Sequence, residues 1–580
     1  MLPDRFRLPR RRRHLPPRAV KQAYSYPEEM YHPPGVGVIA DLQCGGWSTS
    51  ILTSKGEIWS VGVFDAVNGI PLGHPAPTFR RLLWGHVSDE GYQSSEAIEP
   101  IKQFSSGRRH LLGLDDVGNI WYWNRIDKLA KQVEFLTPAL IGGKKPTRVV
   151  AGWQNSSAFV PGQGIVYWEP PDGDQNPYPA INERTVPQTG YAHKEPDHKD
   201  YEIDQEQDQN LSIGEVLVHV VLENYIVYIT STSKVYAFKL NVTERPFQLT
   251  SLSPSDGKLL DIQGSFRNFA IFSSLGEVRT CTTSYLDRWF SALQVSSVDD
   301  GDQTSQRNPS DLLDPPPLIP ALQSNSVISL AFGDYHFHAL HSNGLISSYG
   351  HEAINCGSFG LGTSDRRIAQ LRGLLPPRRF VRRGDTKLSA QGWRSPRSIW
   401  FDPKLRDWAA QMRQPVSERD WDKDIGEGGL DEEGWAAVSE WIEQQGKSYL
   451  MQRTRTKEKD IEAGKNPESQ ESDSINLSPY FAVGISAAGW HSGALVLVDH
   501  DNTTTTTRIE QPQSSEPTPS TPPTDSSSQS LPPLDFPTLK LPSGKTIEGS
   551  KSMNLSEDEI WPLGKPERFW TSADGIPWGT

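Results

Sequence analysis

One repeated pattern dominates this 580-residue chain. An apolar run leads to a glycine, then to a His or small polar residue, a second apolar run, a Gly-containing turn and an aromatic-rich strand. Two clear copies begin at Ile101 and Val327, with their glycines at Gly107 and Gly333. One such unit cannot bury its own apolar face, so several copies must stack and share a core. The pattern therefore favours a repeat architecture.

Seven copies are present, and each has an anchor position where the first strand ends. The anchors are Gly45, Gly107, Gly152, Leu222, Gly264, Gly333 and Gly489. Apolar–polar alternation on both sides of a glycine turn is a hairpin signal, and a radial arrangement of such sheets leaves few free edges. We therefore predict an all-β fold, a seven-bladed β-propeller with long polar loop insertions and one helical insertion. The fourth copy is degenerate, because Leu222 replaces the anchor glycine and Ser233 the turn glycine.

Composition divides the chain into four predicted regions. Residues 1–36 form a basic Pro/Arg-rich arm, and residues 37–500 form the propeller, with insertions at 171–214, 284–326 and 363–479. Residues 501–533 are a Ser/Thr/Pro tract typical of a disordered linker. In the C-terminal segment 534–580, residues 536–544 have the pattern of a strand and a turn. We expect them to close the last blade, which lacks an outgoing strand after Val498.

The third insertion contains the predicted helix. Residues 431–449 begin with acidic side chains, and Trp435, Val438, Trp441 and Ile442 share one helical face. This helix could lie on a blade or bind another protein, and we favour packing on a blade.

Charge and cysteine content exclude several classes of protein. The net charge of −13 argues against a general nucleic-acid binder, and no apolar run is long enough to span a membrane. The three cysteines, Cys44, Cys281 and Cys356, form neither a disulfide framework nor a metal motif. We therefore expect a cytoplasmic or nuclear protein without cofactor or metal. No catalytic motif is present, and we interpret the chain as a non-enzyme.

Three histidines recur near one repeat position, namely His110, His336 and His491. This recurrence admits a metal-binding or catalytic interpretation and a structural one. We favour the structural one, in which each histidine forms a hydrogen bond within its own blade. His336 and His338 alternate on a strand and so face the same side, but no third ligand accompanies them.

Two short segments resemble the regulator of chromosome condensation family. Residues 349–350 and 357–362 (Tyr-Gly, then Gly-Ser-Phe-Gly-Leu-Gly) resemble the glycine-rich tail that ends that family's repeats. Cys44-Gly45 resembles its Cys-Gly-x-x-His-Thr segment, with Ser48-Thr49 in place of His-Thr. The resemblance extends over about residues 36–500. It implies a seven-bladed propeller that acts as a protein-binding platform.

The resemblance implies two alternative functions. Some members exchange guanine nucleotide on a Ran-like small GTPase. Others carry an F-box before the propeller and present substrates to SCF-type ubiquitin ligases through an adaptor and a cullin. The long acidic and Arg-rich insertions, the Trp-bearing helix and residues 539–549 resemble the fungal F-box type. We expect a substrate-recruiting SCF subunit whose F-box is missing from this sequence, because fewer than 40 residues precede the first blade.

Two arginine-rich stretches are candidate contacts for a partner. Residues 10–13 fit either a nuclear-localisation or phosphate-binding arm, or a solvated tail. Seven arginines lie between Arg366 and Arg383, interleaved with apolar side chains. This pattern indicates packing on the propeller rim or docking of an acidic partner. The candidate partner-binding residues are Arg378, Arg379, Arg382 and Arg383.

Overall fold

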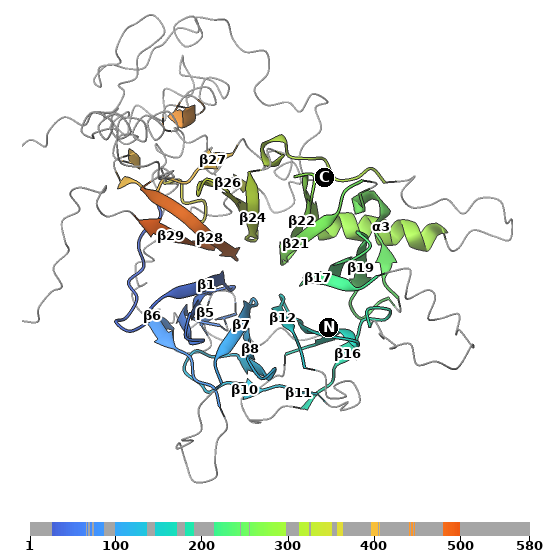
Figure 1. The fold of residues 1–580 in the computed structure, drawn as a ribbon, viewed down its shortest axis with the longest axis horizontal. Helices are drawn as coiled ribbons and strands as arrows, with labels where there is room; N and C mark the ends of the chain where they lie inside the picture. Colours follow the sequence, from blue (N-terminus) through green and yellow to red (C-terminus); the bar gives the residue numbers. More distant parts are fainter. Residues whose placement is uncertain are drawn as a thin grey trace, which may run out of the picture.

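Sheets arranged around a central axis make up the described part of the chain (Figure 1). The computed structural model describes residues 26–64, 66–67, 70–71, 75–85, 99–135, 145–170, 180–190, 214–243, 245–254, 256–296, 313–323, 326–350, 357–362, 396–403, 405–406, 440, 442–444, 446 and 479–498. The innermost strands are neighbours in a closed ring, in the order β1, β7, β12, β17, β21, β24, β28 and back to β1. The predicted all-β propeller class is confirmed.

The first three sheets have four strands each. Sheet 1 contains β1 (Ile39–Cys44), β2 (Ser48–Thr53), β3 (Ile58–Gly62) and β6 (Ala76–Arg81). Sheet 2 contains β7 (Ile101–Ser106), β8 (Leu111–Asp115), β9 (Ile120–Trp123) and β10 (Lys131–Gln132). Sheet 3 contains β12 (Arg148–Ala151), β13 (Ser156–Val160), β14 (Gly164–Trp168) and β16 (Arg184–Thr185).

The remaining sheets vary in strand number. Sheet 4 contains β17 (Val216–Val221), β18 (Tyr225–Thr230), β19 (Val235–Lys239) and β20 (Phe247–Gln248). Sheet 5 contains β21 (Leu259–Ser265), β22 (Asn268–Ser273) and β23 (Val278–Thr282). Sheet 6 contains β24 (Val327–Phe332), β25 (His336–His341), β26 (Ile346–Gly350) and β27 (Arg397–Ser398), and sheet 7 contains β28 (Tyr480–Ala488) and β29 (His491–Val498).

Among the described residues, two pairs of short strands lie outside these sheets. The strands β4 (Ala66–Val67) and β5 (Ile70–Pro71) form an antiparallel pair, and β11 (Glu134–Phe135) pairs in parallel with β15 (Ala180–Ile181).

The predicted count of seven blades is not confirmed. Six sheets have the three or four strands of a blade, whereas the seventh repeat forms only the hairpin β28–β29 within the described residues. The repeat pattern identifies the inner hairpin of each unit, which the seventh copy does contain. The pattern does not specify where an outer strand comes from, and the predicted strand at 536–544 lies outside the described residues.

Close contact between neighbouring sheets explains the anchor glycines. A Cβ on Gly107 would lie 2.6 Å from the carbonyl oxygen of Gly152 in the next sheet. A Cβ on Gly45 would lie 2.9 Å from the carbonyl oxygen of Gly107. Real Cβ atoms do not approach a backbone oxygen so closely, so these positions require glycine. At the degenerate turn, Ser233 adopts the left-handed conformation with φ of 59° despite its side chain.

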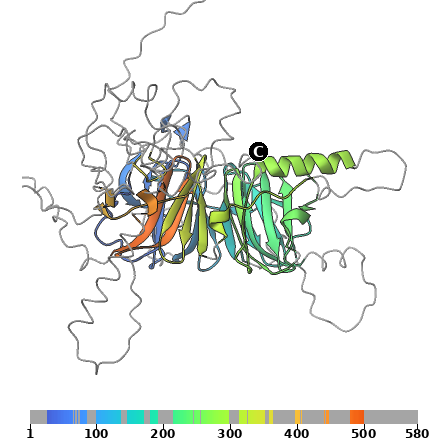
Figure 2. The ribbon, with the colours of Figure 1, turned by 90° about the horizontal axis from the view of Figure 1, so that it is seen from above.

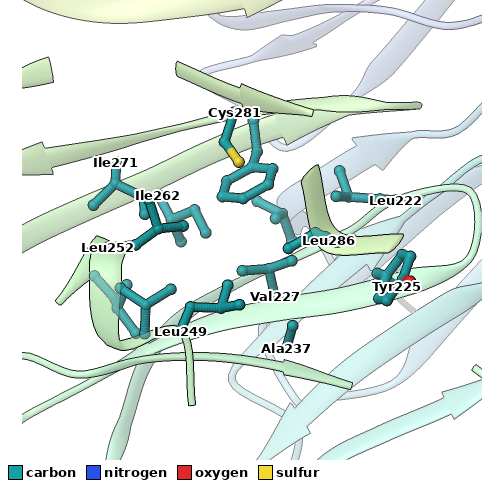
Figure 3. Packing of buried hydrophobic residues seen from close by; sticks show 14 of the residues in the cluster. Leu222, Tyr225, Val227, Ala237, Leu249, Leu252, Ile262, Ile271, Cys281 and Leu286 are labelled. Carbon is teal, nitrogen blue, oxygen red and sulfur yellow. The ribbon is translucent and has the colours of Figure 1, made fainter. Parts of the chain in front are cut away.

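The core consists of apolar layers between adjacent sheets. The layer between sheets 4 and 5 is shown in Figure 3, where Val227 and Leu222 face Ile262 and Cys281. Cys44 and Cys281 are buried free thiols. Complete burial of side chains such as Val227 and Leu222 contributes about 1.5–3 kcal/mol each, so these layers dominate the stability of the ring.

The helix α3 (Thr283–Ser296) corrects the prediction for the second insertion, which we expected to be polar loop. It follows β23 directly, and Tyr285, Leu286 and Trp289 are buried against the layer between sheets 4 and 5. Their spacing places them on one helical face. The described part of the chain also contains the 3-10 turns η1 (Thr250–Leu252) and η3 (Pro320–Leu322).

The helix predicted at 431–449 falls largely outside the described residues. Of this stretch, residues 440, 442–444 and 446 are described and helical, and Ile442 is buried. Glu440 forms an ion pair of 3.2 Å with Arg397, and Glu443 accepts a hydrogen bond from the Ser398 amide. The described part of this helix therefore packs on the outer strand of sheet 6, as we expected.

Two of the predicted insertions also supply short strands, of which β16 and β27 are the outer strands of sheets 3 and 6. The stretch 171–214 contains β15 and β16, and the stretch 363–479 contains β27. Each of these strands is only two residues long, which is too short for a period-two pattern to be visible in the sequence.

Candidate functional site

The loops after the innermost strands meet at one end of the ring, which we call the axial end. Backbone hydrogen bonds join loops of neighbouring sheets there: the Gly46 amide donates to the Arg108 carbonyl, and the Arg108 amide donates to the Gly152 carbonyl. The amide of Asp334 donates in the same way to the carbonyl of Gly489. These bonds fix the side chains that directly follow each anchor position.

Aromatic and cationic side chains form a continuous stack across the axial end. The guanidinium carbon of Arg108 lies 4.7 Å from the centre of the Trp47 ring and 3.2 Å from that of Trp153. Trp153 in turn stacks on Phe266, with 3.7 Å between the ring centres. Sheets 3 and 5, which contribute Trp153 and Phe266, are not neighbours in the ring. The contact between Trp153 and Phe266 therefore spans the end of sheet 4, which lies between them in the ring.

Charged pairs flank this stack. Arg267 lies over Phe266 and donates two hydrogen bonds to Glu223, at 2.7 and 3.2 Å. On the other side, the Arg108 guanidinium lies 3.9 Å from Asp334 Oδ2. We use the name axial stack for Trp47, Arg108, Trp153, Glu223, Phe266, Arg267 and Asp334. The loops after the innermost strands of six of the seven sheets, sheets 1 to 6, contribute to it.

Asp334 is an incompletely satisfied carboxylate. Its side chain is only 13% exposed, and its Oδ1 is buried without a hydrogen-bond partner among the described residues. Burial raises the pKa of Asp334, although Arg108 and Arg267 oppose this shift. Burial also lowers the pKa of Arg108, although Asp334 opposes that shift. A buried acceptor without a donor is unfavourable, so a donor supplied by a bound molecule would stabilise this site.

Two exposed aromatic side chains follow residues of the axial end in the sequence. Tyr335 is 46% exposed and directly follows Asp334. Trp490 is 47% exposed and directly follows Gly489, whose carbonyl accepts the hydrogen bond from the Asp334 amide. Arg109 is exposed beside Arg108. Trp, Tyr and Arg are the residue types most enriched where binding energy concentrates in protein–protein interfaces.

Two further elements lie on the same side of the ring (Figure 2). The helix α3 starts beside the stack, because the Thr283 amide donates to the Arg267 carbonyl. The β4–β5 pair follows β3, whose last residue, Gly62, abuts the backbone of Trp47. The side of the ring that carries the stack therefore also carries the start of α3 and the β4–β5 pair.

The recurring histidines have a structural role, but not the one we predicted. His110 hydrogen-bonds Ser156 at 2.8 Å, and Ser156 belongs to the next sheet. His336 reaches Ser492 of sheet 7 at 2.9 Å, and His491 donates to the Ser48 carbonyl of sheet 1 at 3.0 Å. Each histidine therefore joins neighbouring blades, whereas we expected bonds within one blade. The reason is that the start of each second strand faces the same position of the adjacent sheet.

His336 and His338 do face the same side, as their alternation predicts, and both contact Ser492. No group of three metal-ligating side chains occurs in the described part of the chain.

The predicted partner-binding residues Arg378, Arg379, Arg382 and Arg383 lie outside the described residues. The last described residue of β26, Gly350, abuts the Tyr335 carbonyl at the axial end. Among the described helices, none is long and apolar enough to cross a membrane.

Sequence reasoning missed the axial stack. Its signal is present, because Trp47, Arg108, Trp153, Phe266 and Asp334 all stand one or two residues after an anchor position. Reading the repeats as a stack of layers, position by position, would have placed these side chains together at one end.

The fold and the axial end define a β-propeller with a surface of the protein-binding type. No family model matches the chain. Among curated proteins, it is 24% identical over 287 residues to SCF-associated factor 1 of Saccharomyces cerevisiae, a match that covers 49% of this chain and 37% of that protein. The chain thus matches well under half the length of that relative.

Solved structures with a similar fold include Prp20p of Saccharomyces cerevisiae, whose structure was described together with its binding to Gsp1p and histones. That likeness has 13% identity and a TM-score of 0.40, and covers 80% of this chain and 84% of Prp20p. Yeast RCC1 (Prp20) bound to Kap60 is 16% identical with a TM-score of 0.35, over 56% and 72% of the two chains. These likenesses concern the fold alone.

Proposed function

We propose that this chain is a non-catalytic scaffold that binds a protein substrate at its axial end and recruits it to an SCF-type ubiquitin ligase. The observation that carries the binding role is the axial stack, in which Arg108 lies between two Trp rings beside a carboxylate with an unsatisfied oxygen. The similarity to SCF-associated factor 1 supports the ligase context.

The proposed mechanism is positioning. Exposed Tyr335 and Trp490 supply apolar contact area, and the stack supplies charge and hydrogen bonds. A donor from the substrate, such as a lysine or a backbone amide, satisfies Asp334 Oδ1 on binding. Complementary charge of this kind fixes the orientation of a partner. The ubiquitin transfer chemistry then belongs to other subunits.

The Arg378, Arg379, Arg382 and Arg383 cluster is proposed to extend the same surface. The stretch that carries it follows Gly350, which abuts Tyr335 at the axial end. In this proposal an acidic portion of the substrate contacts these arginines. The adaptor and the cullin associate through an F-box, and the complex acts in the cytoplasm or the nucleus.

The test is affinity capture with quantitative mass spectrometry, using this 580-residue chain and the same chain extended by any upstream coding sequence. The ligase proposal expects the adaptor and the cullin with the extended form, and a substrate captured by both forms. Recovery of a Ran-like GTPase with neither ligase subunit from either form would overturn it in favour of nucleotide exchange.

The role of the axial end is tested separately. A Tyr335→Ala/Trp490→Ala variant should lose the substrate but keep the adaptor and cullin. A Val242→Ala variant is the matched control, because Val242 is 57% exposed in the loop after β19 and takes no part in the axial stack. Unchanged substrate capture by the double variant would exclude the axial end as the binding site.

A further inference from the structure

The second strand of sheet 7 is much less covered than its counterparts. In sheets 1, 2 and 4, every residue of the second strand (β2, β8 and β18) is buried. The equivalent strand of sheet 6, β25, is buried at every residue except the last. In β29 no residue is buried, and Leu497 is 58% exposed although it belongs to an apolar run. In all the other sheets a third strand covers this position.

The apolar layer between sheets 7 and 1 is correspondingly incomplete. Gly493 of β29 faces Leu42 and Cys44 of β1, which identifies the side of sheet 1 that borders sheet 7. On that side Trp59 and Val61 of β3 are only partly buried. In sheet 2 the corresponding strand, β9, is buried throughout. The two incompletely covered surfaces adjoin one another, so one missing strand accounts for both.

The edge of β29 that faces away from β28 has no strand partner among the described residues. An unpaired edge presents a row of free amides and carbonyls, which is a template for another strand. The apolar side chains of β29 and β3 require an occupant with apolar residues at alternate positions.

The chain contains such an occupant beyond β29. Residues 538–541 read Thr-Leu-Lys-Leu, so Leu539 and Leu541 fall on one face of an extended strand, with Pro537 and Pro542 at its ends. Proline is tolerated at strand ends. The intervening stretch, 499–535, can reach up to about 120 Å when extended, which suffices to return the chain to β29.

We propose that residues 536–541 add to the free edge of β29 as the third strand of sheet 7. Leu539 and Leu541 then cover the apolar surface that β29, Trp59 and Val61 leave partly exposed. The occupant belongs to the same chain, and the ring acquires a full seventh blade.

Hydrogen–deuterium exchange of the full-length chain tests this assignment. The amides of β29 that point away from β28 should exchange at least tenfold more slowly in the wild type than in a Leu539→Asp/Leu541→Asp variant. A matched control, Ile509→Asp/Leu531→Asp, places the same changes in the preceding stretch and should behave like the wild type. Amides of sheet 2 report whether each variant is folded.

A second arm keeps the test decisive if the variant is unstable. A synthetic peptide of residues 534–545 is added to the Leu539→Asp/Leu541→Asp variant and should restore protection of β29. Equal β29 exchange in the wild type and the variant would overturn the proposal. If the exchange of β29 is slow in both proteins, another part of the chain or a second copy covers the edge.

Discussion

His110 Nε2 lies 2.8 Å from the hydroxyl of Ser156, and the two residues belong to consecutive sheets. The same step joins His336 to Ser492 and His491 to the Ser48 carbonyl. A histidine at one repeat position thus ties a sheet to its successor at three places around the ring. These bonds are buried or partly buried, so each is a sensitive point for stability.

Removal of the Ser156 hydroxyl should destabilise the ring. A Ser156→Ala variant leaves His110 Nε2 buried without a partner, and we expect the free energy of unfolding to fall by about 1–3 kcal/mol. Ser291→Ala is the control, because that hydroxyl bonds within the exposed face of α3. Urea denaturation measures both. Equal stabilities of the two variants would contradict the bridging role.

Stability should fall as the pH drops from 7.5 to 5. Burial lowers the pKa of His110 and of His338 to about 4, and burial, aided by Arg148, lowers the pKa of His219 to about 3. Since the ordinary value is about 6.5, the unfolded chain binds protons that the folded chain does not between these limits. The stabilisation is therefore complete above pH 6.5 and is lost on acidification. The loss of stability at pH 5, relative to neutral pH, amounts to about 2 kcal/mol per histidine.

Urea titrations at several pH values measure this dependence. A His219→Gln variant should show a shallower slope, because one of the three groups no longer titrates. A slope that His219→Gln leaves unchanged would show that other groups dominate.

Replacement of Arg108 should weaken substrate binding even when the charge is kept. Lysine cannot lie flat between Trp47 and Trp153 as the planar guanidinium does. We expect Arg108→Lys to reduce captured substrate at least tenfold in quantitative pulldown. Arg125→Lys is the control, because Arg125 forms an ion pair with Asp127 in the loop after β9. Equal capture by both variants would separate the stack from binding.

The contact between Arg108 and Trp153 should be measurable as a coupling energy. In a double-mutant cycle of Arg108→Ala and Trp153→Ala, we expect an interaction of about 0.5–2 kcal/mol in the free energy of unfolding. Chemical denaturation of the four proteins provides it. Additive effects would mean that the 3.2 Å approach contributes little to stability.

The inner hairpins of the fold were predictable, because each is encoded by a contiguous stretch with a strong period-two pattern. The anchors Gly107 and Gly152 and the turn at Gly118 mark places where a side chain or an ordinary φ is excluded. The outer strands β16 and β27 were not predictable, since each is two residues long and its pairing depends on tertiary contact.

The axial stack was hidden for a different reason. Arg108, Trp153 and Phe266 are distant in sequence, and only closure of the ring brings them within contact. Individually, each resembles an ordinary loop residue. The histidine bonds show the same limit, because the repeat position of His110 was visible whereas the sheet of its partner was not.

The junction between β28 and β1 joins the two ends of the described propeller. The Cys44 amide donates to Ser486 there, and His491 donates to Ser48. Within the described ranges, no strand pairing crosses this junction. Within the described residues the ring begins at β1 and ends at β29, so a pulling force applied at Ile39 and Val498 acts directly on these few bonds. We therefore expect the interface between sheets 7 and 1 to separate first when the ring is unfolded by force.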